Sequence, residues 1–134
     1  MPYDRLFWTT EEPLVDWFRK NYRRLGFQTS IHEDDPSYDM PKTWRPDFLC
    51  WRAGEKLKVE IEKTATNYSS HRRGYADVVV CYVNDSGGPA YRSAEIIDLE
   101  SRGFLGEITV FDELQELDRL NTKERIKSMG QSDA

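Results

Sequence analysis

Three carboxylates in the middle of the chain have the residue type and the spacing for metal-dependent chemistry. In residues 57–62 apolar and charged residues alternate, so a β-strand there places Glu60 and Glu62 side by side on one face. The Ala53-Gly54 pair before this strand predicts a tight turn, with the preceding residues as the other strand of a hairpin. A hairpin symmetric about that turn places Asp47 directly opposite Glu60, with Cβ atoms roughly 5 Å apart.

Like charges that lie opposite each other destabilise a sheet, so the predicted pair of Asp47 and Glu60 requires a compensating cation. Without a cation, the pair is expected to bring no structural benefit. A hard divalent ion is the simplest candidate, because carboxylate oxygens are its usual ligands. The sequence therefore predicts a site for a hard divalent cation held by Asp47 and Glu60.

The motif around these residues resembles that of a known family. Pro46-Asp47, the thirteen residues from Asp47 to Glu60, and Glu60-Ile61-Glu62 on a strand are similar to the active site of PD-(D/E)XK nucleases. This restriction-endonuclease-like superfamily includes archaeal Holliday-junction resolvases, and the chain's length and order of elements are similar to its minimal core. The third motif residue, usually Lys, is Glu62 here, an acidic variant found in some type II restriction enzymes, and Lys63 falls on the opposite face of the strand.

The resemblance implies a Mg²⁺-dependent DNA endonuclease of junction-resolvase, restriction or viral type, acting as a homodimer, with Mn²⁺ as a substitute for Mg²⁺. The Ile61 carbonyl would be a further metal ligand, and Glu62 would lie beside the attacking water as base or positioner. In this family a glutamate on the first helix often completes the metal site through water, which implies Glu11. Either Glu11 or Glu12 is also explained as a first-turn glutamate that is stabilised by the positive end of the helix dipole.

The residues after the hairpin are candidates for contacts with DNA. Capping residues and a glycine frame a short helix over residues 64–74, and polar side chains spaced by three and four share one of its faces. In the fold that the chain resembles, this helix crosses over to a parallel strand, so its polar face would approach the scissile phosphate. The residues concerned are Asn67, Ser70, His71, Arg72 and Arg73. His71 is also explained as a surface or capping group.

The remaining pattern predicts one α/β domain over residues 1–134, with a mixed central sheet and flanking helices. The β-branched run Val78 to Val83 is typical of a strand that is buried on both faces in a parallel pair. The other expected elements are helices over 9–25, capped by Thr9 or Thr10, and over 112–129, strands over 27–32 and 94–99, a loop over 33–44, and a frayed tail over 129–134. The apolar face of the last helix, or the aromatic N-terminal segment, could form the homodimer interface.

Composition both supports and opposes the nuclease interpretation. The content of 38% hydrophobic residues favours a packed fold, but the net charge of −5 is unusual for a nucleic-acid enzyme and requires local basic patches. Cys50 and Cys81 each lie in an apolar run, which suits buried, reduced thiols in a cytoplasmic protein. No apolar run approaches the length of a membrane span, so we expect a cytoplasmic protein with no membrane partner.

Two other interpretations stay open from the sequence. The acidic balance favours a catalytically inactive nuclease-fold module that binds DNA or regulates, with its carboxylates kept for structure or for a regulatory metal. A Cys/His metal protein would use Cys50, Cys81, His32 and His71, although no CxxC or HxxxH spacing supports it. His32 with the acidic residues of the following loop (Glu33, Asp34, Asp35 and Asp39) is a further, weaker metal candidate. Lys42, Trp44 and Arg45 form a basic and aromatic cluster suited to a phosphate contact.

Overall fold

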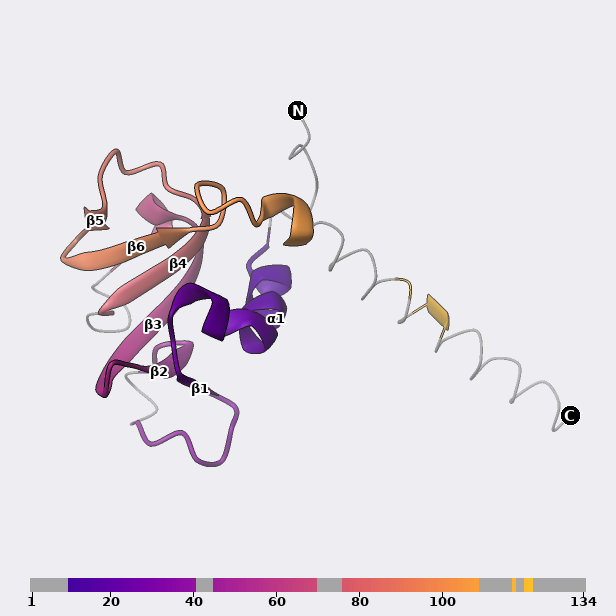
Figure 1. The fold of residues 1–134 in the computed structure, drawn as a ribbon, viewed down its shortest axis with the longest axis vertical. Helices are drawn as coiled ribbons and strands as arrows, with labels where there is room; N and C mark the ends of the chain where they lie inside the picture. The colour runs from indigo at the N-terminus through magenta and orange to yellow at the C-terminus, as the bar shows by residue number, and fades with distance from the viewer. Residues whose placement is uncertain (1–9, 41–44, 70–75, 109–116, 118–119, 122–134) are drawn as a thin grey trace, which may run out of the picture.

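A computed structural model describes residues 10–40, 45–69, 76–108, 117 and 120–121. In this part of the chain, strands form one mixed sheet in the order β1-β2-β3-β4-β6-β5 (Figure 1). The strands are β1 (Thr29–His32), β2 (Phe48–Arg52), β3 (Glu55–Thr64), β4 (Val78–Val83), β5 (Ala90–Tyr91) and β6 (Ala94–Asp98). The helices are α1 (Glu12–Asn21), η2 (Tyr22–Leu25) and η3 (Ala65–Asn67), and residues 105–108 are also helical.

The sheet combines antiparallel and parallel pairs. β1, β2 and β3 pair antiparallel, β4 is parallel to both β3 and β6, and the short β5 closes the far edge antiparallel to β6. The five residues from Val78 to Tyr82 are buried, as expected for a strand between two parallel neighbours. The predicted α/β fold with a mixed central sheet is therefore confirmed, while β5 was not predicted.

The β2–β3 hairpin has the predicted register. Arg52 pairs with Glu55 and, at the other end, Phe48 pairs with Val59. Ala53 and Gly54 have φ values of 52° and 79°, the left-handed pair that a two-residue hairpin turn requires. This turn between β2 and β3 thus fixes which residues of the two strands face each other.

The first helix covers most of the predicted range and ends where expected. The α-helix spans Glu12–Asn21, its last turn tightens into the 3₁₀ turn η2, and Gly26 ends it with a φ of 97°. The predicted threonine cap is wrong at Thr10, because Glu11 occupies the N-cap position without a side-chain bond, and Thr9 lies outside the described residues.

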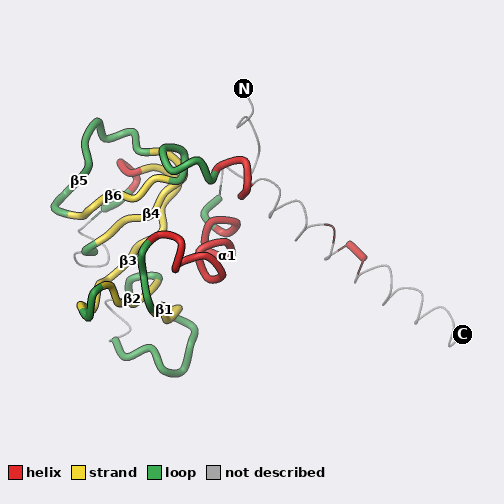
Figure 2. Tube along the Cα trace, in the orientation of Figure 1, coloured by secondary structure: helices red, strands yellow, loops and turns green. Residues whose placement is uncertain are grey.

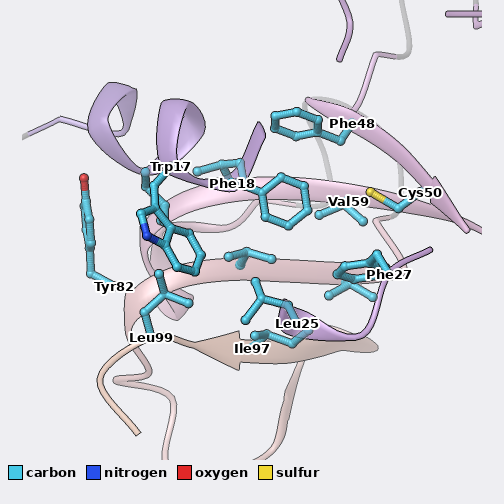
Figure 3. Packing of buried hydrophobic residues seen from close by; sticks show 14 of the residues in the cluster. Trp17, Phe18, Leu25, Phe27, Phe48, Cys50, Val59, Tyr82, Ile97 and Leu99 are labelled. Carbon is cyan, nitrogen blue, oxygen red and sulfur yellow. The ribbon is translucent and has the colours of Figure 1, made fainter. Parts of the chain in front are cut away.

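The apolar stripe of α1 covers one face of the sheet. Trp17 and Phe18 point from the helix onto the strands (Figure 3), and the ring of Phe18 lies 4.6 Å from that of Phe48. Every second residue of the central strands joins this cluster, including Val59 and Ile61 of β3. We call this side of the sheet the helix face.

The opposite face of the sheet is covered by smaller residues. Val79, Cys81, Ala94 and Ile96 point to this side and pack with Ala65, Tyr68 and Ala76 in a second cluster. Glu60 and Glu62 also lie here, because they alternate along β3 with Val59 and Ile61. We call this side the carboxylate face.

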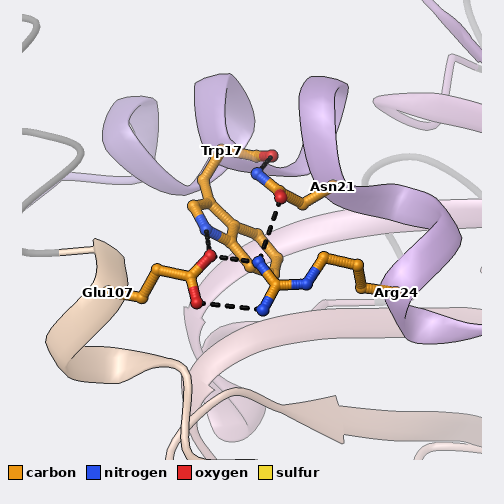
Figure 4. A network of polar contacts seen from close by, with 4 residues as sticks. All are labelled: Trp17, Asn21, Arg24 and Glu107. Atoms are coloured by element: carbon orange, nitrogen blue, oxygen red, sulfur yellow. Dashed lines mark hydrogen bonds and ion pairs between the residues drawn. The ribbon is translucent and has the colours of Figure 1, made fainter.

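A polar network fastens the segment after β6 to α1 (Figure 4). Both oxygens of Glu107 accept hydrogen bonds from the guanidinium of Arg24, and the indole N–H of Trp17 donates to Glu107 Oε1 at 3.3 Å. The hydrogen bond from Arg24 lowers the pKa of Glu107 below its usual value. Asn21 accepts a further bond from Arg24, so four side chains connect two distant parts of the sequence.

The helix predicted over residues 64–74 is wrong in its described part. Only Ala65–Asn67 form a 3₁₀ turn, and Tyr68 then has an extended backbone. The reason is tertiary: the Tyr68 ring is buried on the carboxylate face, and its hydroxyl accepts a hydrogen bond from the Ala76 N–H at 2.6 Å. Residues 70–74 lie outside the described residues, as do the predicted tail and most of the helix predicted over 112–129.

Candidate functional site

The candidate site lies where β2 begins and β3 continues beyond it. β2 starts at Phe48, opposite Val59, whereas β3 runs on to Thr64. The N–H of Ile61 therefore has no partner within β2, and it donates instead to Oδ2 of Asp47 at 2.8 Å. The Asp47 side chain thus takes the place of one ladder bond at the end of the shorter strand.

The Glu60 side chain makes the reciprocal contact. Its Oε1 accepts the backbone N–H of Asp47 at 3.1 Å, and Glu60 is only 5% exposed. The next pair along the hairpin register after Phe48 and Val59 is Asp47 and Glu60, so the predicted apposition is present. Each carboxylate bonds to a backbone N–H of the other strand, which gives the pair a structural use without a cation and corrects the sequence-based expectation.

The backbone of Ile61 adds a third oxygen to this place. Asp77 donates its N–H to the Lys58 carbonyl at 2.8 Å, so the carbonyl of Lys58 points toward β4. Carbonyl directions alternate along a strand, and a residue's own N–H and C=O point to the same side. The Ile61 carbonyl therefore points to the side of β3 on which Asp47 lies.

Glu62 follows on the same face of the sheet. It is partly buried and lies in register with Cys81 of β4. Burial raises the pKa of the Cys81 thiol to about 12, and the charges of Asp98, Asp85 and Glu62 contribute in the same direction. The carboxylate face therefore carries Glu60 and Glu62 in sequence, next to a protonated thiol.

The structure does not gather all predicted metal ligands into one cluster. Among the described residues, no group of three or more His, Cys, Asp or Glu side chains is arranged to hold a metal ion. Glu11 begins α1, which packs on the helix face, and the carbonyl of the preceding Thr10 accepts the Tyr82 hydroxyl at 3.1 Å. Asp47 and Glu60 are brought together, and Glu11 and Glu62 are not joined with them in a ligand group.

The predicted nucleic-acid contacts fall largely outside the described residues, which include Asn67 but not Ser70, His71, Arg72 or Arg73. Asn67 is exposed at the end of η3. That turn is held to the end of β4, because Thr66 donates both its N–H and its hydroxyl to Asp85. Since the chain becomes extended at Tyr68, Asn67 does not begin the helical face expected from the sequence.

Among the described residues, His32 and the acidic side chains of the loop after β1 do not form the further metal site considered from the sequence. The Arg19 guanidinium and the Asp34 N–H both donate to Nδ1 of His32, and burial, then Arg19, lowers the His32 pKa. Because Nδ1 accepts both hydrogen bonds, the neutral imidazole carries its proton on Nε2. An open cleft of about 330 Å³ lies here, on the helix face, away from Asp47 and Glu60; it is lined by Arg19, Ser30, His32, Asp34, Asp35 and Phe48.

Tyr38 was missed by the sequence analysis, although it contacts the candidate site. Its hydroxyl donates to the Pro46 carbonyl at 2.5 Å, and the side chain is buried. Burial raises the pKa of the phenol well above its usual range, and the nearby charges of Glu33, Glu60 and Asp47 also raise it. The only available signal was one aromatic residue in a loop rich in Asp and Pro, which does not say what that residue contacts.

Comparisons with protein-family models, with curated proteins and with solved structures give no match for this chain. Among the described residues, none of the helices is both long and apolar enough to cross a membrane.

Proposed function

We propose that the chain is a Mg²⁺-dependent endodeoxyribonuclease that hydrolyses phosphodiester bonds in DNA. The observation that carries this proposal is the pair of hydrogen bonds that joins Asp47 and Glu60 at the point where β2 begins, on the side to which strand alternation directs the Ile61 carbonyl. The motif resemblance supports it, and so does the parallel pairing of β3 with β4, which agrees with the crossover that the resemblance implies.

The donor set suits Mg²⁺ although it lacks a third carboxylate. Mg²⁺ is usually bound through one or two carboxylates, with waters and substrate oxygens completing its octahedron. Two carboxylates and one carbonyl therefore suffice as protein ligands, and all three are oxygen donors for a hard cation. Mn²⁺ prefers the same donors and would substitute.

The roles of the side chains follow from their positions. When bound, the cation would neutralise charge on the scissile phosphate. Asp47 and Glu60 would hold it, and Glu62, two residues along the same face, would take a proton from the attacking water or orient it. No lysine stands at the third motif position, so this site relies on the cation for more of the charge neutralisation.

The partners are proposed as DNA and a second copy of the chain. Leu117 and Leu120 are 54% and 50% exposed, and large apolar side chains that are exposed on one segment suit a homodimer contact. The proposed DNA substrate is a four-way junction, a duplex or a replication intermediate. The two buried, reduced thiols fit a cytoplasmic location.

Cleavage assays test this function directly. Labelled four-way junction, duplex and single-stranded DNA are incubated with the protein, with and without Mg²⁺ or Mn²⁺. We expect metal-dependent cleavage by the parent, and its loss in Asp47→Asn and Glu60→Gln with unchanged circular dichroism, because each substitution removes a ligand charge at nearly constant volume. Absence of cleavage of all three substrates by the folded parent, with either metal, would contradict the proposal.

A second function is favoured by two specific observations. Both carboxylates already accept backbone hydrogen bonds, and the net charge is −5, which together suit a catalytically inactive nuclease-fold module that binds DNA or regulates. Gel-shift assays separate the two: metal-independent DNA binding that persists in Asp47→Asn, with no cleavage by the parent, would support the binding module.

A further inference from the structure

Residues of the loop between β1 and β2, drawn in green in Figure 2, hydrogen-bond to the two residues just before β2. The Tyr38 hydroxyl donates to the Pro46 carbonyl at 2.5 Å, and the Glu33 N–H donates to the Asp47 carbonyl at 3.0 Å. Tyr38 is only 7% exposed, so its hydrogen bond is shielded from water. The loop therefore hydrogen-bonds to the carbonyls of Pro46 and Asp47, which lie on either side of the Asp47 Cα.

Local turns deliver the Tyr38 ring to this position. The Asp35 N–H donates to the His32 carbonyl and the Tyr38 N–H donates to the Asp35 carbonyl, both at 2.9 Å. Oδ1 of Asp35 accepts the N–H and the hydroxyl of Ser37 at 2.9 and 2.7 Å, which closes the turn between them. The loop is thus held by its own hydrogen bonds before it reaches the site.

Arg45 closes the contact from the other side. Its guanidinium lies 5.1 Å from the centroid of the Tyr38 ring, and its Nη1 donates to the Glu33 carbonyl at 2.9 Å. Arg45 therefore contacts both Glu33 and Tyr38, with the Tyr38 ring beside the Arg45 guanidinium and the Tyr38 hydroxyl on the Pro46 carbonyl. The ring contact depends on the aromatic system, and the carbonyl contact depends only on the hydroxyl.

We propose that Tyr38 is a positioning residue that fixes the direction of the Asp47 carboxylate through the Pro46 carbonyl. The proposal rests on the metal-binding role of Asp47 given above. The proline ring restricts the Pro46 φ angle, and the bonds to the Pro46 and Asp47 carbonyls restrict the peptide planes on either side of Asp47. With its backbone held in this way, Asp47 presents Oδ2 to the Ile61 N–H at 2.8 Å, next to the Ile61 carbonyl.

The test compares Tyr38→Phe with a matched control. Tyr38→Phe removes the hydroxyl and keeps the ring beneath Arg45. Tyr82→Phe removes a similar bond, from a phenol to the Thr10 carbonyl at 3.1 Å, on the helix face. The metal-free proteins are titrated with Mn²⁺ by calorimetry. We expect about tenfold weaker binding in Tyr38→Phe, the size typical when a residue that orients a metal ligand is lost. The Kd of Tyr82→Phe should be unchanged.

Amide exchange gives a second measurement that needs no metal. The Ile61 N–H is protected by Asp47 Oδ2, so its exchange should be about tenfold faster in Tyr38→Phe than in the parent. The amides of β4 provide the internal control and should exchange at the parent's rate. Cleavage by Tyr38→Phe should return toward the parent's rate as Mn²⁺ approaches saturation.

The possible outcomes separate this proposal from the proposed function. Equal Mn²⁺ affinity and equal Ile61 exchange in the parent and in Tyr38→Phe would overturn the positioning role and leave the metal site standing. Equal weakening in Tyr82→Phe would also overturn it, because the effect would then be one of general stability. A parent that binds no Mn²⁺ would overturn the metal site and the positioning role together.

Discussion

The two faces of the central sheet are built from the same strands and differ in almost every other respect. On the helix face, large aromatic and aliphatic side chains from α1 meet Val59, Ile61 and their neighbours in one continuous core. On the carboxylate face, the cluster is smaller and consists mainly of Ala, Val, Ile and Cys around one tyrosine. Alternation along β3 thus divides one strand into a side that stabilises the fold and a side that carries charge.

The contrast is sharpest in what each face buries. Among the described residues, Glu60 is the only buried charged side chain, and it lies on the carboxylate face. A buried carboxylate is costly unless it accepts hydrogen bonds or neutralises a cation. The Asp47 N–H supplies one bond at 3.1 Å, so the fold holds an acidic group within the sheet at the point where a cation could bind.

The largest expected effect comes from truncating the helix face. Phe18 is fully buried and its ring lies close to those of Phe27 and Phe48, at 5.9 and 4.6 Å. Phe18→Ala should lower the free energy of unfolding by about 3 to 5 kcal/mol, measured by urea denaturation. Gln28→Ala, at an exposed position next to the buried Phe27, is the control and should change it by less than about 0.5 kcal/mol. A loss below about 1 kcal/mol in Phe18→Ala would show that this face is not the main source of stability.

A smaller and more informative effect is expected on the carboxylate face. Glu60→Ala leaves the Asp47 N–H without its acceptor and should cost about 1 to 2 kcal/mol in metal-free protein. Glu60→Gln keeps an oxygen acceptor and removes the repulsion with Asp47, so it should match or exceed the parent's melting temperature. Calorimetry of both variants without metal separates the hydrogen bond from the charge, and equal losses in the two would show that the charge itself stabilises this pair.

The smallest expected effect concerns the thiols, one on each face. Burial raises the pKa of Cys50 to about 12, and burial together with nearby carboxylates raises that of Cys81 to about 12. Because the thiolate is the reactive form, neither should react with a disulfide reagent at pH 8 until the protein unfolds. Colourimetric titration with and without urea checks this, and Cys81→Ser identifies any thiol that does react. Rapid labelling of Cys81 in the native protein would show that the carboxylate face opens.

The sequence by itself determined the features that depend on local geometry and period. The Ala53-Gly54 turn predicted the hairpin register, which places Asp47 next after the pair Phe48 and Val59. Alternation along β3 placed Glu60 and Glu62 on one face, and the β-branched run at Val78–Val83 predicted a strand buried on both sides. These predictions succeed because turn angles and side-chain alternation are set by residues close together in the chain.

Only the tertiary structure decided how these elements are connected. Tyr38 reaches Pro46 because hydrogen bonds among His32, Asp35, Ser37 and Tyr38 turn the loop. Tyr68 ends the expected helix because its ring is buried under the sheet, and Arg24 meets Glu107 across 83 positions of sequence. The same holds for the candidate site, where the Glu60 carboxylate accepts the Asp47 N–H and the Asp47 carboxylate accepts the Ile61 N–H, two bonds that the sequence did not predict. Which donor a carboxylate finds depends on where the neighbouring strand ends, and that is set by packing across the whole sheet and not by any local pattern.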